Sequence, residues 1–145
     1  MFSKSCEYGI RAAIYIAGQS LKDERVSLKA IAHEIDSPVA FTAKILQQLS
    51  RNNVIDSVKG PTGGFMIDKQ KMNSVSLRDI VKAIDGDGIF KTCGLGLKDC
   101  SEKHPCPVHN QFKSIRANLC HMLDHTSVYE LSLGLKDGST FLRHH

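Results

Sequence analysis

The sequence predicts a mainly α-helical chain that contains a winged helix-turn-helix, with a small β-hairpin as the wing, followed by one long C-terminal helix. Three observations lead to this class. Three amphipathic segments precede a glycine-rich hairpin, a cysteine-containing loop follows, and a final long segment repeats its apolar residues every 3.5 residues on average.

Composition restricts the protein class before any motif is considered. The chain has 145 residues, 41% of them hydrophobic, which suits one compact core with an extension. It has no run of about 20 apolar residues, and MFSKSCEYGI lacks the apolar core of a signal peptide. We therefore expect a cytoplasmic protein with no membrane partner. Five cysteines, an odd number, favour metal or redox chemistry over structural disulfides in that compartment.

The first three helices are predicted from apolar spacing and from capping residues. The first begins near Ser3 or Ser5, and Ser27 is the expected N-cap of the second. Asp36-Ser37-Pro38 ends the second helix and opens the third, and Asn52-Asn53 ends the third in left-handed geometry. The inward faces are Ile10, Ile14, Ala17 and Leu21, then Leu28, Ile31, Ala32 and Ile35, then Phe41, Ile45, Leu46 and Leu49.

A hairpin and a fourth helix come next. Residues 54–58 and 65–67 predict two strands around the glycine-rich tip 59–64. Ser76 is the N-cap of a short helix that residues 85–88 end. Residues 88–107 are rich in Gly, Cys and Pro and lack periodicity, so we expect a long loop with a functional reason.

The segment after Pro107 predicts the long helix. A spacing of four, three, four and three is typical of two helices that pack on each other, so we favour a dimer over packing within one subunit. The seam consists of Val108, Phe112, Ile115, Leu119 and Met122. Ser127-x-x-Glu130 is a capping box for a last short helix, followed by a loosely ordered tail.

The third helix and the hairpin form the expected DNA-binding surface. Residues 37–71 carry five basic and two acidic side chains, and a helix from Pro38 to Asn52 has the length to lie in a major groove. Glycines in the wing would allow close approach to the sugar-phosphate backbone. The same fold as a protein–protein module is the alternative. The candidate contacts are Pro38, Thr42, Lys44, Gln47, Gln48 and Arg51 in the helix and Lys59, Gly60, Thr62, Gly63 and Gly64 in the wing.

A second constellation, Cys93-x6-Cys100-x5-Cys106, predicts a metal centre. Thiolates are soft ligands that favour iron-sulfur clusters or zinc, and a glycine-containing loop can wrap three of them around one centre. A fourth ligand is required, and the sequence offers His109, His104, Cys6 and Glu7. Cys120, in the middle of the long helix, is expected to be a packed structural thiol.

Together these residues resemble the bacterial winged-helix regulators typified by the iron-sulfur cluster regulator and the nitric-oxide-sensitive repressor. The resemblance rests on EYGIRA at 7–12, LQQL at 46–49, SVKGPTGGF at 57–65 and the three-cysteine loop before a long helix. It implies a homodimer that binds a palindromic operator in double-stranded DNA as a repressor. It also implies a cluster in each subunit that responds to oxidants, nitric oxide or iron shortage.

The resemblance further implies a ligand set. In the iron-sulfur cluster regulator three cysteines and a histidine hold a two-iron cluster, and Cys93, Cys100, Cys106 and His109 match those positions. Other members take an acidic residue near the partner's N-terminus, where Glu7 stands here. The resemblance favours a two-iron two-sulfur cluster. Six residues, where the family usually has five, separate the first two cysteines, so a four-iron four-sulfur cluster and a different fourth ligand stay open.

The sequence thus predicts a regulator and no enzyme, since no catalytic grouping or nucleotide-binding loop is present. Zinc or a thiol switch could replace the cluster on the same DNA-binding fold, and a small iron-sulfur carrier without DNA binding is the alternative from another class. The expected divisions are 1–86, the DNA-binding domain; 87–107, the cluster-binding loop; 108–133, the dimerisation region; and 134–145, a flexible tail.

Overall fold

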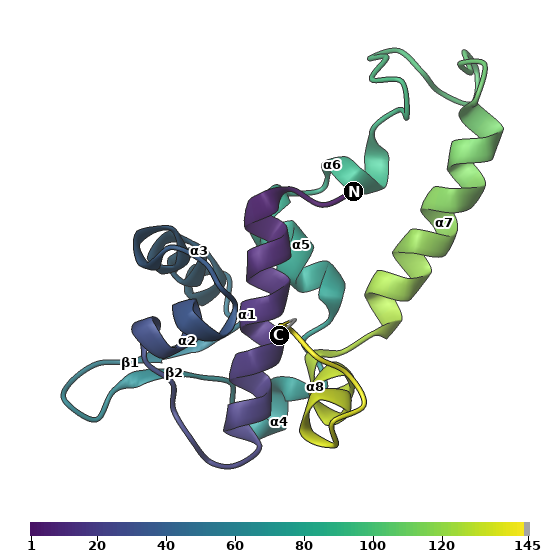
Figure 1. Ribbon diagram of the computed structural model, residues 1–145. Helices are drawn as coiled ribbons and strands as arrows, with labels where there is room; N and C mark the ends of the chain where they lie inside the picture. The colour runs from purple at the N-terminus through teal and green to yellow at the C-terminus, as the bar shows by residue number, and fades with distance from the viewer. Residues whose placement is uncertain (144–145) are drawn as a thin grey trace.

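The computed structural model describes residues 1–143, which form eight helices and one two-stranded antiparallel sheet. This agrees with the mainly helical class and single hairpin that the sequence predicts. None of the helices in this range is long and apolar enough to span a membrane. The elements are α1 (Lys4–Ser20), α2 (Leu28–Glu34), α3 (Val39–Arg51), β1 (Asp56–Val58), β2 (Gly64–Met66), α4 (Lys69–Met72), α5 (Leu77–Asp85), α6 (Gly88–Lys91), α7 (His109–His125) and α8 (Val128–Lys136) (Figure 1).

The predicted helix starts are confirmed by their hydrogen bonds. Four serine hydroxyls each accept a backbone N–H of the first turn, and such a cap stabilises a helix by about 0.5–2 kcal/mol. Asn53 ends α3 with a φ of 59°, as its left-handed preference predicts. The four caps are Ser3 to the N–H of Cys6, Ser27 to Ala30, Ser76 to Asp79 and Ser127 to Glu130.

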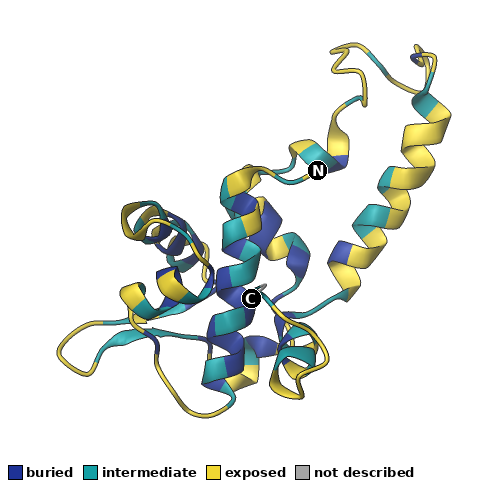
Figure 2. Cartoon of the chain, viewed as in Figure 1, coloured by how far each residue is buried: buried dark blue, intermediate teal, exposed yellow. Residues whose placement is uncertain are grey.

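Helix α1 is the centre of the core. It packs most extensively against α8 and α5 and also contacts α3 (Figure 1). Gly9 makes the approach to α5 possible, because a Cβ atom there would lie 2.1 Å from Cδ1 of Ile84. Figure 2 shows the buried residues gathered on the facing sides of these helices. The fully buried side chains include Ile16, Ile31, Ile45, Leu46, Leu49 and Ile80.

The wing is tied to the helical body by a third short segment. Val58 pairs with Gly64 at the tip side of the hairpin, and Val26, between α1 and α2, exchanges two backbone hydrogen bonds with Phe65, at 3.0 and 2.8 Å. A Cβ at Gly63 would lie 2.1 Å from the Val58 carbonyl oxygen, so the hairpin itself requires this glycine. The conformation of the wing tip is therefore fixed by backbone contacts within the hairpin.

Helix α7 stands away from the body (Figure 1), and most of its surface is exposed (Figure 2). Its C-terminal part returns to α5 through the fully buried Leu123. Of the predicted seam, Val108 and Leu119 are half-buried, whereas Phe112, Ile115 and Met122 are exposed. The described chain thus presents an apolar stripe on a projecting helix, as a dimerisation helix would.

Three local expectations require correction. The four-residue helices α4 and α6 were not predicted because they are too short to show periodicity, and α6 occupies 88–91 of the expected loop. Residues 134–136 of the expected flexible tail belong to α8. Beyond α8, Arg143 donates to the carbonyl oxygen of His33 at 3.3 Å, so this segment returns to α2. Residues 144–145 of the expected tail lie outside the described residues.

Candidate metal centre and nucleic-acid interface

The loop between α6 and α7 brings the three predicted cysteines together. The Sγ atoms of Cys93, Cys100 and Cys106 all lie within 4.8 Å of one another, and those of Cys93 and Cys106 are 3.6 Å apart. The loop backbone supports this arrangement, since the N–H of Cys106 points at the Cys100 sulfur at 3.4 Å. Three cysteines spread over fourteen positions of an irregular loop therefore form one compact group of sulfur atoms.

The thiols differ in acidity because their surroundings differ. Backbone N–H groups of Leu95 and Leu97 point at the sulfur of Cys93 and lower its pKa to about 7. Burial raises the pKa of Cys106. Burial and the neighbouring carboxylate of Asp85 raise the pKa of Cys6 to about 12, which makes that thiol inert at neutral pH.

His109 is the fourth-ligand candidate that the structure places beside the sulfurs. It begins α7, and its Nδ1 atom lies 3.3 Å from the Cys100 Sγ atom. Its Nε2 atom is buried without a hydrogen-bond partner among residues 1–143. In the same range Glu7 is not part of the cysteine group, and its carboxylate pairs with Lys4 at 3.7 Å. His104 is exposed in the loop.

The cavity at the sulfurs is lined by two cations that sequence reasoning missed, Lys91 and Arg116. Arg116 comes from α7 and donates to the carbonyl oxygen of Thr92, directly before Cys93. In a sequence, a charged residue on a polar helix face is expected to point into solvent. The signal that could have identified Arg116 is its spacing of seven residues from His109, about two helical turns, which places both on one face of α7.

A contact between α5, α6 and α7 connects this loop to the helical body. Arg78 of α5 donates to both carboxylate oxygens of Asp124 in α7, at 3.2 and 3.1 Å. The same guanidinium lies 4.3 Å from the ring centroid of Phe90 in α6. Phe90 is buried and precedes Cys93 by only three residues. A movement of the loop would therefore be transmitted to this contact.

Helix α3 presents most of its predicted DNA-contacting side chains to solvent. Pro38, Lys44, Gln47 and Arg51 are exposed and Gln48 is half-buried. Thr42 is different, since its side chain is fully buried. The expectation that Thr42 contacts DNA is therefore corrected. Its hydroxyl donates to the carbonyl oxygen of Pro38 at 2.8 Å and is hydrogen-bonded to Ser37, which closes the turn between α2 and α3.

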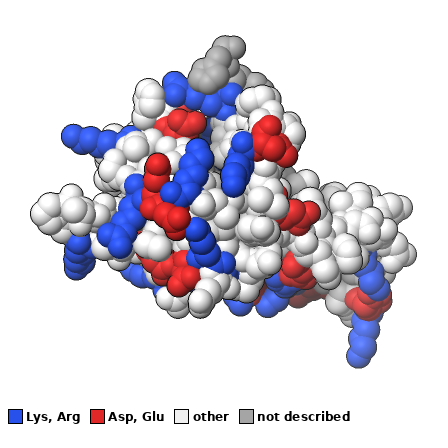
Figure 3. Space-filling view, turned by 90° about the horizontal axis from the view of Figure 1, so that it is seen from below, with Lys and Arg blue, Asp and Glu red and all other residues white. Residues whose placement is uncertain are grey.

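The wing adds exposed groups beside α3. Lys59, Gly60 and Thr62 are exposed, and a Cβ at Gly60 would meet open space, whereas Gly63 and the half-buried Gly64 serve the hairpin's own backbone. Figure 3 shows acidic and basic side chains interleaved on the lower face, so no single-sign field covers it. Within residues 1–143 the cations at 44, 51 and 59 take part in no ion pair, which leaves them free for phosphates.

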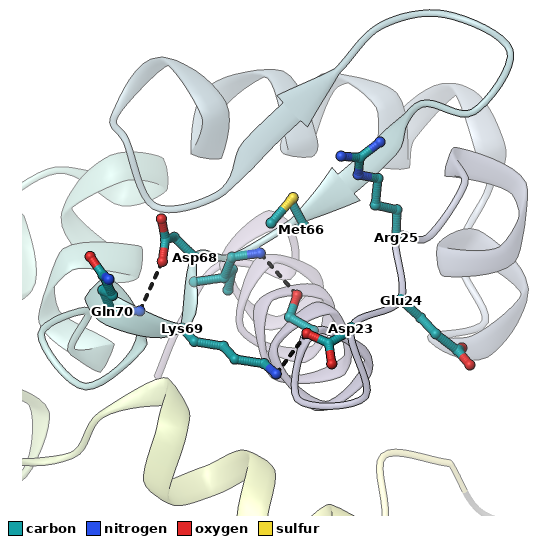
Figure 4. A pocket seen from close by; sticks show the side chains of 9 residues that line it. Asp23, Glu24, Arg25, Met66, Asp68, Lys69 and Gln70 are labelled. Carbon is teal, nitrogen blue, oxygen red and sulfur yellow. Dashed lines mark hydrogen bonds and ion pairs between the residues drawn. The ribbon is translucent and has the colours of Figure 1, made fainter.

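Residues that line a pocket at the base of the wing connect the wing to the helical body (Figure 4). Lys69 pairs with Asp23 at 2.7 Å, and the backbone N–H of Ile67 donates to the Ser20 hydroxyl at 2.9 Å. Arg25 donates to the carbonyl oxygen of Thr62 at 3.3 Å. These contacts join the end of α1 to β2, α4 and the wing tip, so the pocket is part of the wing's support.

Comparison with known proteins decides the class. Residues 2–132 match the model of the Rrf2 family, which is described as iron-dependent transcriptional regulators. The chain belongs to the Rrf2 family. The predicted resemblance to winged-helix regulators of the iron-sulfur cluster regulator type is thereby confirmed. The protein is a winged-helix transcriptional regulator, and homologues of this class bind DNA.

Individual Rrf2 relatives are distant in sequence and close in fold. A protein of Aquifex aeolicus named as an HTH-type transcriptional regulator is 29% identical over 133 residues, 90% of each chain. The structure of CymR, the global cysteine regulator of B. subtilis, matches with a TM-score of 0.75 at 20% identity and covers 92% of this chain and 96% of its own. T. potens IscR matches with a TM-score of 0.71 at 17% identity, over 97% and 91%.

Proposed function

We propose that this Rrf2 protein is a homodimeric repressor whose affinity for a palindromic operator is set by an iron-sulfur cluster. Cys93, Cys100 and Cys106 would hold the cluster, with His109 as the fourth ligand. The observation that carries the proposal is the convergence of three sulfur atoms within 4.8 Å in an otherwise irregular loop. The family's description as iron-dependent regulators supports the same reading.

The donor set fits such a cofactor. Thiolates are the ligands of iron-sulfur clusters, and an imidazole nitrogen completes the set in some of them. His109 fits this set because its Nδ1 atom lies 3.3 Å from the Cys100 sulfur, so that nitrogen can face a metal held by the cysteines and Nε2 is left to carry the proton. When bound, the cluster supplies sensitivity to oxidants, nitric oxide and iron supply. A two-iron two-sulfur cluster remains the favoured form.

DNA reading is assigned to α3 and the wing. Lys44, Gln47 and Arg51 project from the exposed face of α3, where side chains can reach base edges or phosphates in a major groove. Lys59 and Thr62 at the wing tip would reach the neighbouring backbone. Lys59 supplies charge without the bidentate fork of an arginine, so it positions the wing without reading bases.

A dimer would bring two such surfaces to one palindrome. The exposed Phe112, Ile115 and Met122 on α7 supply an apolar stripe that a second copy would cover. Closed two-fold symmetry is the commonest form of soluble oligomer and mirrors a palindromic site. In this arrangement Glu7 of the second subunit remains an alternative fourth ligand, since its carboxylate is exposed on α1.

The link between cluster and DNA would run through the α5–α6–α7 contact. Loss of the cluster would free the loop, whose neighbours α7 and α6 contact Arg78 of the body through Asp124 and Phe90. A coupling free energy of about 1–3 kcal/mol would change operator affinity by about 5- to 150-fold. A regulatory response of this size is what the contact would have to carry.

The test begins with anaerobic purification or reconstitution, a visible spectrum, and a count of iron and sulfide per chain. An operator is then selected from random DNA, and holo and apo protein are compared on it at fixed salt. Cys100→Ser should abolish the cluster and the holo–apo difference. Cys120→Ser, a cysteine outside the loop, is the matched control and should retain both. Equal affinities of holo and apo protein would contradict the regulatory step.

Zinc is the second candidate, because the three cysteine sulfurs and the His109 imidazole also form a tetrahedral zinc donor set. Two thiolates on one tetrahedral zinc ion lie about 3.8 Å apart, from a Zn–S bond of about 2.3 Å, and the Cys93 and Cys106 sulfurs are 3.6 Å apart, which is compatible with zinc. Colourless protein with one zinc and no sulfide would establish this form. A carrier that binds a cluster and no DNA is disfavoured, because the matched relatives are named as transcriptional regulators.

A further inference from the structure

The two nitrogen atoms of His109 face different surroundings. Nδ1 lies 3.3 Å from the Cys100 Sγ atom. Nε2 lies 3.7 Å from Oε1 of Glu102 and, within the described part of the chain, has no hydrogen bond. The ring therefore presents one nitrogen to the sulfur atoms and the other to a carboxylate.

Glu102 is held at this position from α7. The Lys113 ammonium donates to the same carboxylate oxygen, Oε1. Lys113 follows His109 by four residues in α7, so the two side chains project from the same face of the helix. Glu102 itself lies in the loop, two residues after Cys100. The Glu102 carboxylate thus connects the cysteine loop to His109 and Lys113 at the start of the long helix.

We propose that Glu102 is a positioning residue of the metal centre, which accepts a hydrogen bond from Nε2–H of His109 and so presents Nδ1 to the metal. A neutral imidazole carries its proton on one nitrogen, and only the other can bind a metal. Histidine ligands commonly donate their free N–H to a carboxylate, which orients the ring and raises its basicity. Because the Glu102 side chain is 66% exposed, a small rotation closes the 3.7 Å gap.

This inference rests on the proposed metal centre and adds the residue that selects the ligating nitrogen. It also explains a feature that the cysteines alone leave open. A buried Nε2–H without an acceptor would cost free energy in the metal-bound state, and within residues 1–143 Glu102 is the carboxylate paired with this ring. Lys113 supports the metal centre indirectly, because its hydrogen bond keeps the Glu102 carboxylate beside His109.

The test is an anaerobic titration of the reduced full-length protein with Co²⁺, followed by its sulfur-to-metal absorption. Glu102→Ala should weaken binding about 10-fold, the lower end for residues that support a ligand, because the carboxylate is partly exposed. Glu102→Gln should recover part of the loss, since its amide oxygen still accepts a hydrogen bond. Asp99→Ala removes an exposed acid of the same loop and is the control for charge, with no change expected.

A double-mutant cycle separates positioning from a general effect on the loop. In a His109→Ala background, Glu102→Ala should cause no further loss, because its route to the metal is gone. Equal effects of Glu102→Ala in both backgrounds, or an effect no larger than that of Asp99→Ala, would overturn the inference while leaving the metal centre intact. Wild-type protein that takes up neither Co²⁺, zinc nor an iron cluster would overturn the inference and the proposed function together.

Discussion

Replacement of Arg78 by alanine tests the proposed path from the cysteine loop to the DNA-binding body. The side chain makes two separable contacts. In its ion pair with Asp124, one nitrogen, Nη1, donates to both carboxylate oxygens; the two side chains are 35% and 40% exposed, and the pair is worth about 0.5–1 kcal/mol. Its guanidinium stacks over Phe90 at 4.3 Å, worth a similar amount. We expect Arg78→Ala to lower the free energy of unfolding by about 1–2 kcal/mol.

The same number limits the regulatory effect. If the contact forms in only one cluster state, its loss changes the ratio of holo to apo operator affinity by at most about 5- to 30-fold. The assay is a pair of operator titrations, holo and apo, at one salt concentration. Arg78→Lys keeps a positive charge that can pair with Asp124 and lie over Phe90, so its ratio should lie between those of the wild type and Arg78→Ala. Lys82→Ala, one turn further along α5 and exposed, is the control and should leave the ratio unchanged.

A clear result would refute this reasoning. If Arg78→Ala destabilises the fold as expected but leaves the holo-to-apo ratio equal to that of the Lys82→Ala control, then the contact is structural and carries no signal. Coupling would then have to pass through another route, such as the seam between two α7 helices.

Three further predictions concern the wing, the thiols and the dimer. Gly63→Ala should reduce operator affinity and lower the melting temperature, because its Cβ would lie 2.1 Å from a backbone oxygen, whereas Gly88→Ala, with open space around it, should be neutral in thermal unfolding. In metal-free protein, the rate of Cys93 alkylation by iodoacetamide should rise as the pH passes about 7, because its lowered pKa gives the thiolate there. Cys6, with a pKa of about 12, should stay unmodified in the folded state. Mass spectrometry of digests measures the modification of both cysteines. Ile115→Glu should shift the protein toward monomer in sedimentation, since it places a charge on the exposed apolar stripe; an unchanged dimer would show that α7 is not the interface.

Those parts of the fold that depend on neighbours in sequence were predictable. Serine caps act within one helical turn, so Ser27 and Ser76 could be assigned without tertiary information. The burial of Thr42 was also within reach, because it precedes Ile45 and Leu46 by three and four residues and so shares their inward face. Its polarity suggested DNA contact, and the hydrogen bond to the Pro38 carbonyl shows why a buried threonine is tolerated there.

The candidate metal centre divides in the same way. Cysteine spacing predicted that the three thiols form one group, because few other residue patterns account for thiols in a polar loop. Glu102 and Arg116 could not be predicted, since an exposed loop acid and a helical arginine look like ordinary solvated residues. Only the fold of residues 92–108 against α7 brings them to the sulfurs. Supporting residues of this kind depend on tertiary packing and leave no periodic trace.

The contact between α1 and α8 has a consequence for how this protein can change. Helices α1 and α8 pack on each other, so residues 92–122 form a segment that leaves the helical body and returns to it at the buried Leu123. This segment can gain a residue or exchange a ligand without moving α3 or the wing. A proteolytic cut between Leu95 and Pro105 would yield two fragments that remain associated through α1 and α8. The candidate metal loop and the proposed DNA-contacting surface are thus parts of one chain that can vary separately.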